Sequence, residues 1–183
     1  MDQNAESYIR YVNGDDGGFY DLVRTYFDSL CAFIYGITGD RGLSEELADD
    51  TFYRLAVKKP HYDSRSSFKT WLFSIGRHIA ADALRKKRAD VIPIDDEAAA
   101  ADGSTPESAY LLDERKRALY SAMSKLKPEY RQVLWLTFFE NMSAEEVSLV
   151  MRKSKNNVYT LLSRAKDSLK IKLTEEGFDY EDL

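Results

Sequence analysis

The sequence predicts an all-α fold of two small helical domains joined by a flexible acidic linker. Apolar residues recur three and four positions apart over most of the chain, and no strand-like alternation persists. The segment 89–109 holds six acidic residues, no basic residue and two prolines, so it cannot bury a core and is typical of a linker. The chain is therefore expected to divide into a domain at 1–88, this linker, a domain at 110–173 and an acidic, partly mobile tail at 174–183.

Two amphipathic stretches predict the main helices of the first domain. The first stripe consists of Phe19, Val23, Phe27, Leu30 and Ile34. The second consists of Phe68, Leu72, Ile75 and Ile79, with Trp71 beside them. The glycine-rich stretch 14–18 predicts a loop, and Gly39 and Gly42 flank another.

In the second domain, a third stripe indicates a helix that follows the linker. It consists of Leu112, Leu119, Met123 and Leu126. Pro128 suits the first position of a further helix, which we expect to run through Trp135 and Phe138.

A helix-turn-helix is predicted near the C-terminus by two helix starts eleven residues apart. Ser143 and Glu146 form a capping box, and Ser154 is the second N-cap. The second helix should bury Val158, Leu161, Leu162, Ala165 and Leu169. Its other face suits phosphates and base edges in a major groove. That face presents Lys155, Asn156, Asn157, Tyr159, Thr160, Ser163, Arg164 and Lys166.

The charge distribution supports contact with nucleic acid. Residues 152–172 carry seven basic side chains and one acidic one, whereas the whole chain has a net charge of −5. Basic residues at a helix C-terminus can also simply complement the helix dipole. That alternative does not account for the bases at the other end of the segment, which are Arg152, Lys153 and Lys155.

A second basic segment lies in the first domain. Residues 69–88 carry six basic side chains and one acidic one, and Tyr62, Phe68 and Trp71 lie beside or within the segment. Bases interleaved with aromatic rings suit single-stranded nucleic acid. Phe68 and Trp71 also occupy core spacing, which favours a structural role for them, whereas Tyr62 lies in a polar loop.

Composition argues against several other classes of protein. A single cysteine, Cys31, cannot form an internal disulfide. The acidic residues 1–6 are not expected to be a secretory signal, and no apolar stretch of the sequence approaches the roughly 20 residues of a membrane span. His61 and His78 are the only histidines and show no metal-ligand spacing. The loop at 14–18 lacks the lysine and hydroxyl of a phosphate loop. We therefore expect no catalytic residues, no metal and no cofactor.

Two segments of the first domain resemble conserved region 2 of bacterial sigma factors. They are residues 44–55 and 68–88, and the helix-turn-helix resembles region 4 of the same proteins. The resemblance spans about residues 15–173. Regions 2 and 4 on a short linker are the arrangement of extracytoplasmic-function (ECF) sigma factors.

The resemblance implies roles for three surfaces. The core polymerase-binding residues would be Glu46, Leu47, Asp50 and Phe52, although this segment alone also fits a solvated acidic face with a core leucine. Residues 62–68 match a segment that captures a flipped base of the minus-ten element. The minus-ten set would be Tyr62, Ser66, Phe68, Lys69, Arg77, His78, Arg85, Lys86, Lys87 and Arg88. The helix-turn-helix face given above would read the minus-thirty-five element.

The expected function is therefore that of a cytoplasmic promoter-specificity subunit. Its partners would be core RNA polymerase, promoter DNA as duplex and melted strand, and an anti-sigma factor. The alternative is a stand-alone helix-turn-helix regulator that binds duplex DNA without polymerase. His78 stands where the family usually has asparagine, and it could either change the minus-ten base preference or pack inside the helical bundle.

Overall fold

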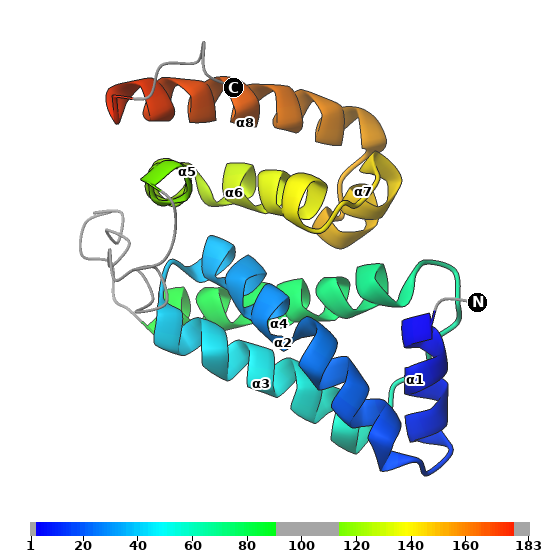
Figure 1. Cartoon of the computed structure of the whole chain (residues 1–183). Coiled ribbons are helices and arrows are strands. Elements are labelled where there is room, and N and C mark those ends of the chain that lie inside the picture. The colour runs from blue at the N-terminus through cyan, green and yellow to red at the C-terminus, as the bar shows by residue number, and fades with distance from the viewer. Residues whose placement is uncertain (1–2, 91–113, 178–183) are drawn as a thin grey trace.

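The computed structural model describes residues 3–90 and 114–177, and every secondary-structure element in these ranges is helical (Figure 1). The predicted all-α class is thereby confirmed. Residues 89 and 90 end a helix, and the rest of the predicted linker lies outside the described residues. Residues 110–113, including the expected stripe residue Leu112, also lie outside them, as do 178–183.

Four helices build the first domain: α1 (Gln3–Val12), α2 (Asp16–Thr38), α3 (Arg41–Lys58) and α4 (Phe68–Asp90). Asp15 caps α2 by accepting a hydrogen bond from the Gly17 N–H, and Asp40 caps α3 through the Leu43 N–H. The loop expected at 14–18 is therefore shorter than predicted, because the Asp15 cap starts α2 before the pair Gly17 and Gly18.

The core of the first domain lies among α2, α3 and α4. Its fully buried side chains include Leu22, Leu30, Phe33, Phe68 and Leu72. The stripe predicted for α2 is offset from the observed one, since its Phe19, Val23 and Phe27 are only partly buried. The reason is that α2 contacts α1, α3 and α4 at once, so its buried surface is wider than a single stripe.

Close packing at Gly18 gives a stability prediction. A Cβ at this position would lie 2.2 Å from the Ser7 carbonyl oxygen of α1, where the backbone cannot yield easily. Gly18→Ala should lower the free energy of unfolding by about 1–3 kcal/mol through overpacking. Gly42→Ala is the control, because its nearest neighbour would be the Asp40 carboxylate at 3.8 Å. Urea unfolding of both variants checks this, and equal stabilities would contradict it.

The second domain consists of α5 (Glu114–Ser124), α6 (Pro128–Leu134), a π-helical turn η2 (Trp135–Phe139), α7 (Ala144–Met151) and α8 (Lys155–Glu175). Pro128 occupies the start of α6, as predicted. The π-helical turn was not predicted. It stacks the rings of Trp135 and Phe139 with their centroids 4.4 Å apart.

Helix α8 continues into the predicted acidic tail. Its last residue is Glu175, and the carboxylate of Glu176 accepts hydrogen bonds from Ser121 of α5 and from Lys125, which directly follows α5. The first residues of the expected tail therefore belong to the packed domain.

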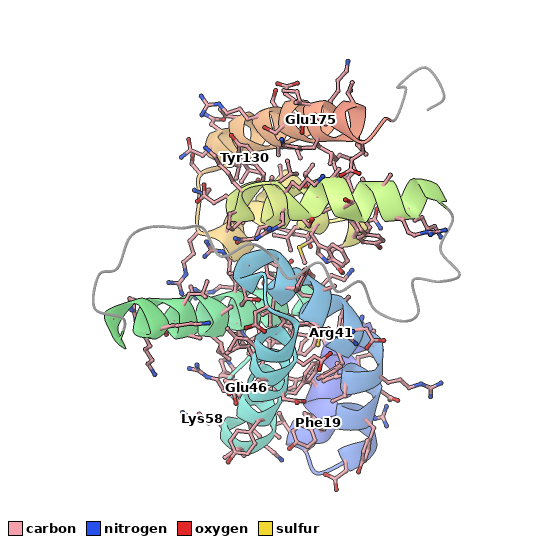
Figure 2. The ribbon with its side chains drawn as sticks, turned by 90° about the vertical axis from the view of Figure 1, so that its left-hand side faces the viewer. Phe19, Arg41, Glu46, Lys58, Tyr130 and Glu175 are labelled. Carbon is pink, nitrogen blue, oxygen red and sulfur yellow. The ribbon has the colours of Figure 1, made fainter. Side chains whose placement is uncertain are left out.

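The two domains pack directly on each other. Helices α6 and α7 of the second domain contact α2 and α4 of the first, while α8 lies on the outer side of α6 (Figures 1 and 2). The second domain covers part of one predicted binding surface of the first and does not cover the polar face of α8 or the exposed side of α3.

Candidate nucleic-acid interface

The predicted helix-turn-helix is present as α7 and α8. The Ser143 hydroxyl accepts a hydrogen bond from the Glu146 N–H at 3.3 Å, and the Ser143 N–H donates to the Glu146 carboxylate at 2.9 Å, which completes the capping box. The Ser154 hydroxyl accepts from the Asn157 N–H at 3.2 Å and starts α8. Between the helices, Arg152 adopts a left-handed conformation with φ of 52° and so closes α7.

The polar face of α8 is exposed along its whole predicted length. Val158 and Ala165 are buried and fix the orientation of the helix, while Leu161, Leu162 and Leu169 are partly buried. The eight predicted reading residues are all exposed. Two of the lysines have contacts within the domain, since Lys155 pairs with Glu145 at 2.9 Å and the Lys166 ammonium lies 5.2 Å from the ring centre of Phe138. The Thr160 hydroxyl donates to the Asn156 carbonyl at 3.1 Å.

On α4, the basic residues fall into two groups. Arg85, Lys86 and Lys87 are exposed near the C-terminal end of the helix, whereas Lys69 and Arg77 are partly buried against the second domain. The Arg77 Nε donates to the Gln132 Oε1 at 3.0 Å. Burial, together with the positive charge of Arg152, lowers the pKa of the Arg77 guanidinium. Arg88 lies in α4, but its side chain is outside the described part of the chain.

Aromatic rings cluster beside the start of α4. The Tyr62 ring meets Phe68 edge-on at 5.7 Å and lies 5.3 Å from Trp71, and its hydroxyl donates to the Ser66 carbonyl at 2.6 Å. Phe68 is fully buried, so its side chain is a core residue in this structure. Tyr62 is partly exposed, and its ring packs against two other rings without stacking on either.

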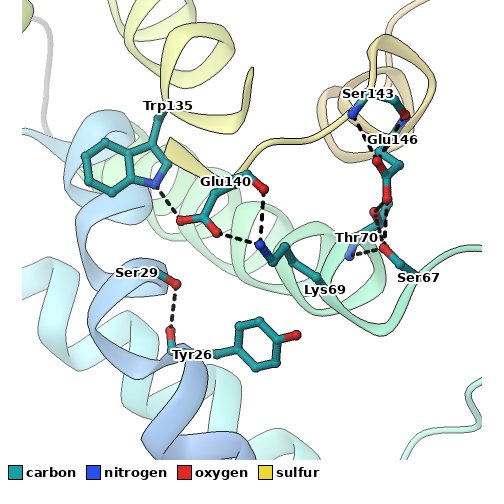
Figure 3. Close-up of polar contacts among 9 residues, drawn as sticks. All are labelled: Tyr26, Ser29, Ser67, Lys69, Thr70, Trp135, Glu140, Ser143 and Glu146. Atoms are coloured by element: carbon teal, nitrogen blue, oxygen red, sulfur yellow. Dashed lines mark hydrogen bonds and ion pairs between the residues drawn. The ribbon is translucent and has the colours of Figure 1, made fainter. Parts of the chain in front are cut away.

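The loop and helix around Lys69 contact two glutamates of the second domain (Figure 3). The Lys69 ammonium lies 3.2 Å from the Glu140 carboxylate and donates to the Glu140 carbonyl at 3.1 Å. The Glu146 carboxylate accepts hydrogen bonds from the hydroxyls of Ser67 at 2.9 Å and Thr70 at 3.1 Å. The two predicted binding regions are thus linked through side chains.

On α3, the four predicted polymerase-contact residues separate into two faces. Glu46 and Asp50 are exposed, and Figure 2 shows Glu46 on α3, away from the helices of the second domain. Leu47 and Phe52 are each only 4% exposed and pack in the core. Their placement on the docking surface is therefore corrected, because a side chain buried among α2 and α3 residues cannot meet a partner in this conformation.

Comparison with known proteins identifies the family. The model of "Sigma-70 region 2" matches residues 22–89, and that of "Sigma-70, region 4" matches residues 116–169. The Bacillus subtilis ECF RNA polymerase sigma factor SigM is 30% identical over 150 residues, which cover 82% of this chain and 91% of that protein. The chain belongs to the ECF sigma factor family. Another relative, SigW of Bacillus subtilis, is 28% identical over 187 residues, covering 96% of this chain and all of SigW.

Solved structures share the fold of this sigma factor. A Bartonella quintana sigma factor, RpoE, in complex with the anti-sigma factor NepR has a TM-score of 0.63 at 21% identity, covering 85% of this chain and 96% of that one. CnrH in complex with the cytosolic domain of CnrY has a TM-score of 0.62 at 21% identity, covering 94% of this chain and 95% of that one. The first domain is region 2 and the second is region 4.

Two exposed apolar residues on α3 were not singled out from the sequence. Tyr53 is 67% exposed and Val57 is 61% exposed, and both follow Glu46 and Asp50 at helical spacing on one face. The signal that could have revealed them is the pattern itself, since Tyr53 lies three positions after the exposed Asp50 and Val57 four positions after Tyr53, on the same face and off the core stripe.

The structure places His78 outside the bundle core. Its side chain is 43% exposed, and Nε2 lies 3.3 Å from the Asp82 carboxylate one turn along α4. It lines a shallow pocket together with Arg54, Trp71 and Arg152. Of the two alternatives for this residue, packing inside the bundle is therefore wrong, while the effect on base preference stays a prediction.

A metal-binding cluster, a membrane-spanning helix or a reactive thiol would indicate a different function. Among residues 3–90 and 114–177, no group of three or more metal-binding side chains comes together, and no helix is long and apolar enough to cross a membrane. Partial burial and neighbouring carboxylates raise the pKa of the Cys31 thiol to about 11, which keeps it protonated and poorly reactive at neutral pH.

The Glu146 carboxylate gives a pH prediction. Burial alone would raise its pKa, but hydrogen bonds from the Ser143 N–H and from three hydroxyls outweigh burial and lower it. A lowered folded-state pKa means that the stabilisation is complete above the unfolded pKa of about 4.3 and is lost as the pH falls through the folded value. Glu146→Gln should therefore cost about 1 kcal/mol at pH 7 and progressively less below pH of about 4.

Urea unfolding of wild type and Glu146→Gln across pH 3–7 measures this difference. The other carboxylates titrate in both proteins, so the difference between the two curves isolates residue 146. A gap that stayed constant down to the lowest pH would contradict the role of the carboxylate charge.

Proposed function

We infer that this ECF sigma factor is the promoter-specificity subunit of a bacterial RNA polymerase. It binds core enzyme, recognises the minus-thirty-five and minus-ten elements and promotes melting of the DNA. The observation that carries this conclusion is the presence, in one chain, of a region 2 domain and a region 4 helix-turn-helix whose basic polar face is exposed.

Run-off transcription tests the function. Purified chain added to core polymerase on a promoter library should select a subset of promoters, whereas core enzyme alone should select none. Recovery of the same subset with the chain lacking residues 1–90 would contradict the requirement for region 2.

A stand-alone DNA-binding regulator is the alternative function. The region 2 match and the exposed face of α3 argue against it, because neither is needed for binding duplex DNA alone. Size-exclusion chromatography separates the two functions, since a sigma factor should co-elute with core polymerase in the absence of DNA.

The docking face for core polymerase is proposed to be the exposed side of α3. Acidic Glu46 and Asp50 provide charge, and Tyr53 and Val57 provide apolar anchors along the same face. Acids that surround exposed apolar residues suit a basic helical partner, because the apolar pair can be buried while the charges form the rim. Leu47 and Phe52 act from beneath by holding α3 on the core.

The minus-ten surface is proposed to combine the aromatic cluster around Tyr62 with the basic face of α4. His78 offers a test of base selection, because a histidine ring and an asparagine amide present hydrogen-bonding atoms with different geometry. His78→Asn should shift the preferred minus-ten base while changing the free energy of unfolding by less than about 0.5 kcal/mol, as expected for a partly exposed position.

Transcription from a minus-ten base series, with urea unfolding of the same variant, checks this prediction. Binding of duplex minus-thirty-five DNA serves as the internal control and should not change. An unaltered base preference would remove His78 from the base-capture site.

We further propose an anti-sigma factor as a partner. The RpoE protein, which has the same fold, was solved bound to the anti-sigma factor NepR, and both domains of this chain offer exposed helices to a partner. We expect the chain to act in the cytoplasm with polymerase, without catalytic activity or a cofactor of its own.

A further inference from the structure

Region 4 covers part of the minus-ten surface of region 2. The Lys69 ammonium, a predicted minus-ten contact, pairs with the Glu140 carboxylate, whose side chain is only 6% exposed. The same carboxylate accepts a hydrogen bond from the Trp135 indole N–H at 3.1 Å, and the π-helical turn η2 delivers it to this position. A carboxylate buried this deeply requires a cation beside it, and region 2 supplies that cation.

Three further contacts between region 4 and region 2 lie along the same face. Glu146 accepts from the hydroxyls of Ser67 and Thr70 at the start of α4, and Arg77 donates to the Gln132 side chain. At the other end of the interface, the Arg131 Nε donates to the Gly36 carbonyl of α2 at 2.9 Å. Lys69 and Arg77, two candidate DNA contacts, are thus partly buried against region 4, and Arg77 uses its donor on Gln132.

We propose that this face of region 2 has two mutually exclusive occupants, which are region 4 in the free protein and the backbone of the promoter strand in the transcribing complex. The inference rests on the proposed function. Glu140 and Glu146 take the places of phosphates, because an anionic oxygen beside a lysine and two hydroxyls meets the same partners as a phosphate oxygen.

When region 4 is packed on region 2, which we call the closed arrangement, it covers part of the proposed minus-ten surface but not the two other proposed surfaces. The acidic face of α3 and the reading face of α8 both remain exposed, so the closed protein can still meet core polymerase and duplex minus-thirty-five DNA. Engagement with polymerase would have to separate the regions before the minus-ten strand could bind. Binding in this order would suppress unproductive contact of the free protein with single-stranded DNA.

A reversible crosslink can hold the regions together. A Cβ built at Gly36 would lie 3.7 Å from the Cβ of Arg131, which is within the range of about 3.5–4.5 Å that disulfides require. The double variant Gly36→Cys with Arg131→Cys, made with Cys31→Ala to remove the native thiol, should therefore form a disulfide on oxidation. The same background carrying only Gly36→Cys or only Arg131→Cys controls for each substitution.

Oxidation of the double variant should lower run-off transcription roughly tenfold or more, and reduction should restore it to the level of the single variants. Core polymerase should still bind the oxidised protein through α3, but less tightly than the reduced protein, because the crosslink prevents the opening that polymerase favours. Equal transcription in the two states would overturn the inference alone, and failure to form the disulfide would show that the closed contact is not populated. Inactivity of the reduced and single variants on every promoter would contradict the proposed function itself.

Weakening the contact between regions 2 and 4 should have the opposite effect and favour binding of single-stranded DNA. Glu140→Gln keeps an acceptor for the Trp135 N–H but removes the charge that holds Lys69. The free protein should then bind a single-stranded minus-ten oligonucleotide about three- to tenfold more tightly in fluorescence anisotropy. Glu175→Gln is the matched control, because its carboxylate pairs with Lys172 inside α8.

A purely local effect of charge on DNA would persist when the regions are crosslinked. The gain from Glu140→Gln should therefore disappear in the oxidised double variant. Persistence of the gain there would assign it to electrostatics near the DNA and contradict the competition.

Discussion

Asp50→Arg should nearly abolish binding to core RNA polymerase while leaving the fold intact. Asp50 is exposed on α3 in line with Glu46, Tyr53 and Val57, so the substitution places a positive charge in the middle of an acidic docking face. The new positive charge would face the basic helical partner proposed for this surface. Like charges brought together at an interface cost several kcal/mol, so we expect a loss of about 2–4 kcal/mol in binding free energy. The dissociation constant for core enzyme, measured by surface plasmon resonance, provides the test.

Asp167→Arg is the matched control for this charge reversal. Asp167 is an exposed acid on α8 of region 4, so it has the same change in net charge without touching the docking face. Tyr53→Ala should also weaken binding, because it removes the largest exposed apolar side chain of α3. Unchanged affinity for both Asp50→Arg and Tyr53→Ala would place the polymerase contact elsewhere.

The second large effect is expected at Arg164. Its guanidinium is exposed on the reading face of α8, between the buried turns set by Val158 and Ala165. A bidentate contact between arginine and a base edge contributes about 1–3 kcal/mol of discrimination, so Arg164→Ala should weaken duplex minus-thirty-five binding by that amount and relax the preference at one base pair.

Comparison with Lys166→Ala distinguishes a contact to a base from a contact to the phosphate backbone. A lysine that contacts a phosphate should weaken binding to all sequences alike and reduce its salt dependence. Binding measured on the preferred site and on a series of single-base variants compares the two substitutions. A uniform loss for Arg164→Ala would reassign it to the DNA backbone, and no loss would remove it from the interface.

Local physical chemistry allowed the helix-turn-helix to be predicted. Its two helix starts depend on side chains that cap the backbone within three residues, as Ser143 and Ser154 do, so neither start needs a distant partner. The exposed face of α8 follows equally directly from the helical repeat, because Val158 and Ala165 fix which side is buried.

Prediction from the sequence was weaker wherever a helix is covered on several sides. Helix α3 illustrates this, since a docking motif taken residue by residue placed Leu47 and Phe52 on the surface, while packing against α2 buries both. Tyr53 and Val57 could be recognised as surface residues only once that packing fixed the rotation of the helix. The same holds for Tyr62, whose polar loop folds its ring against Phe68 and Trp71.

By itself the sequence determined the helices with a clear apolar stripe, the capped turn and the charge of the DNA-facing helix, because each depends on neighbours within one or two turns. Only the tertiary structure decided which of the basic residues on α4 are free. Lys69 and Arg77 meet Glu140 and Gln132 across more than fifty positions of sequence, and no local pattern records such a contact. The π-helical turn that positions Glu140 also depends on tertiary structure, because such a widened turn is stabilised by the residues that pack around it.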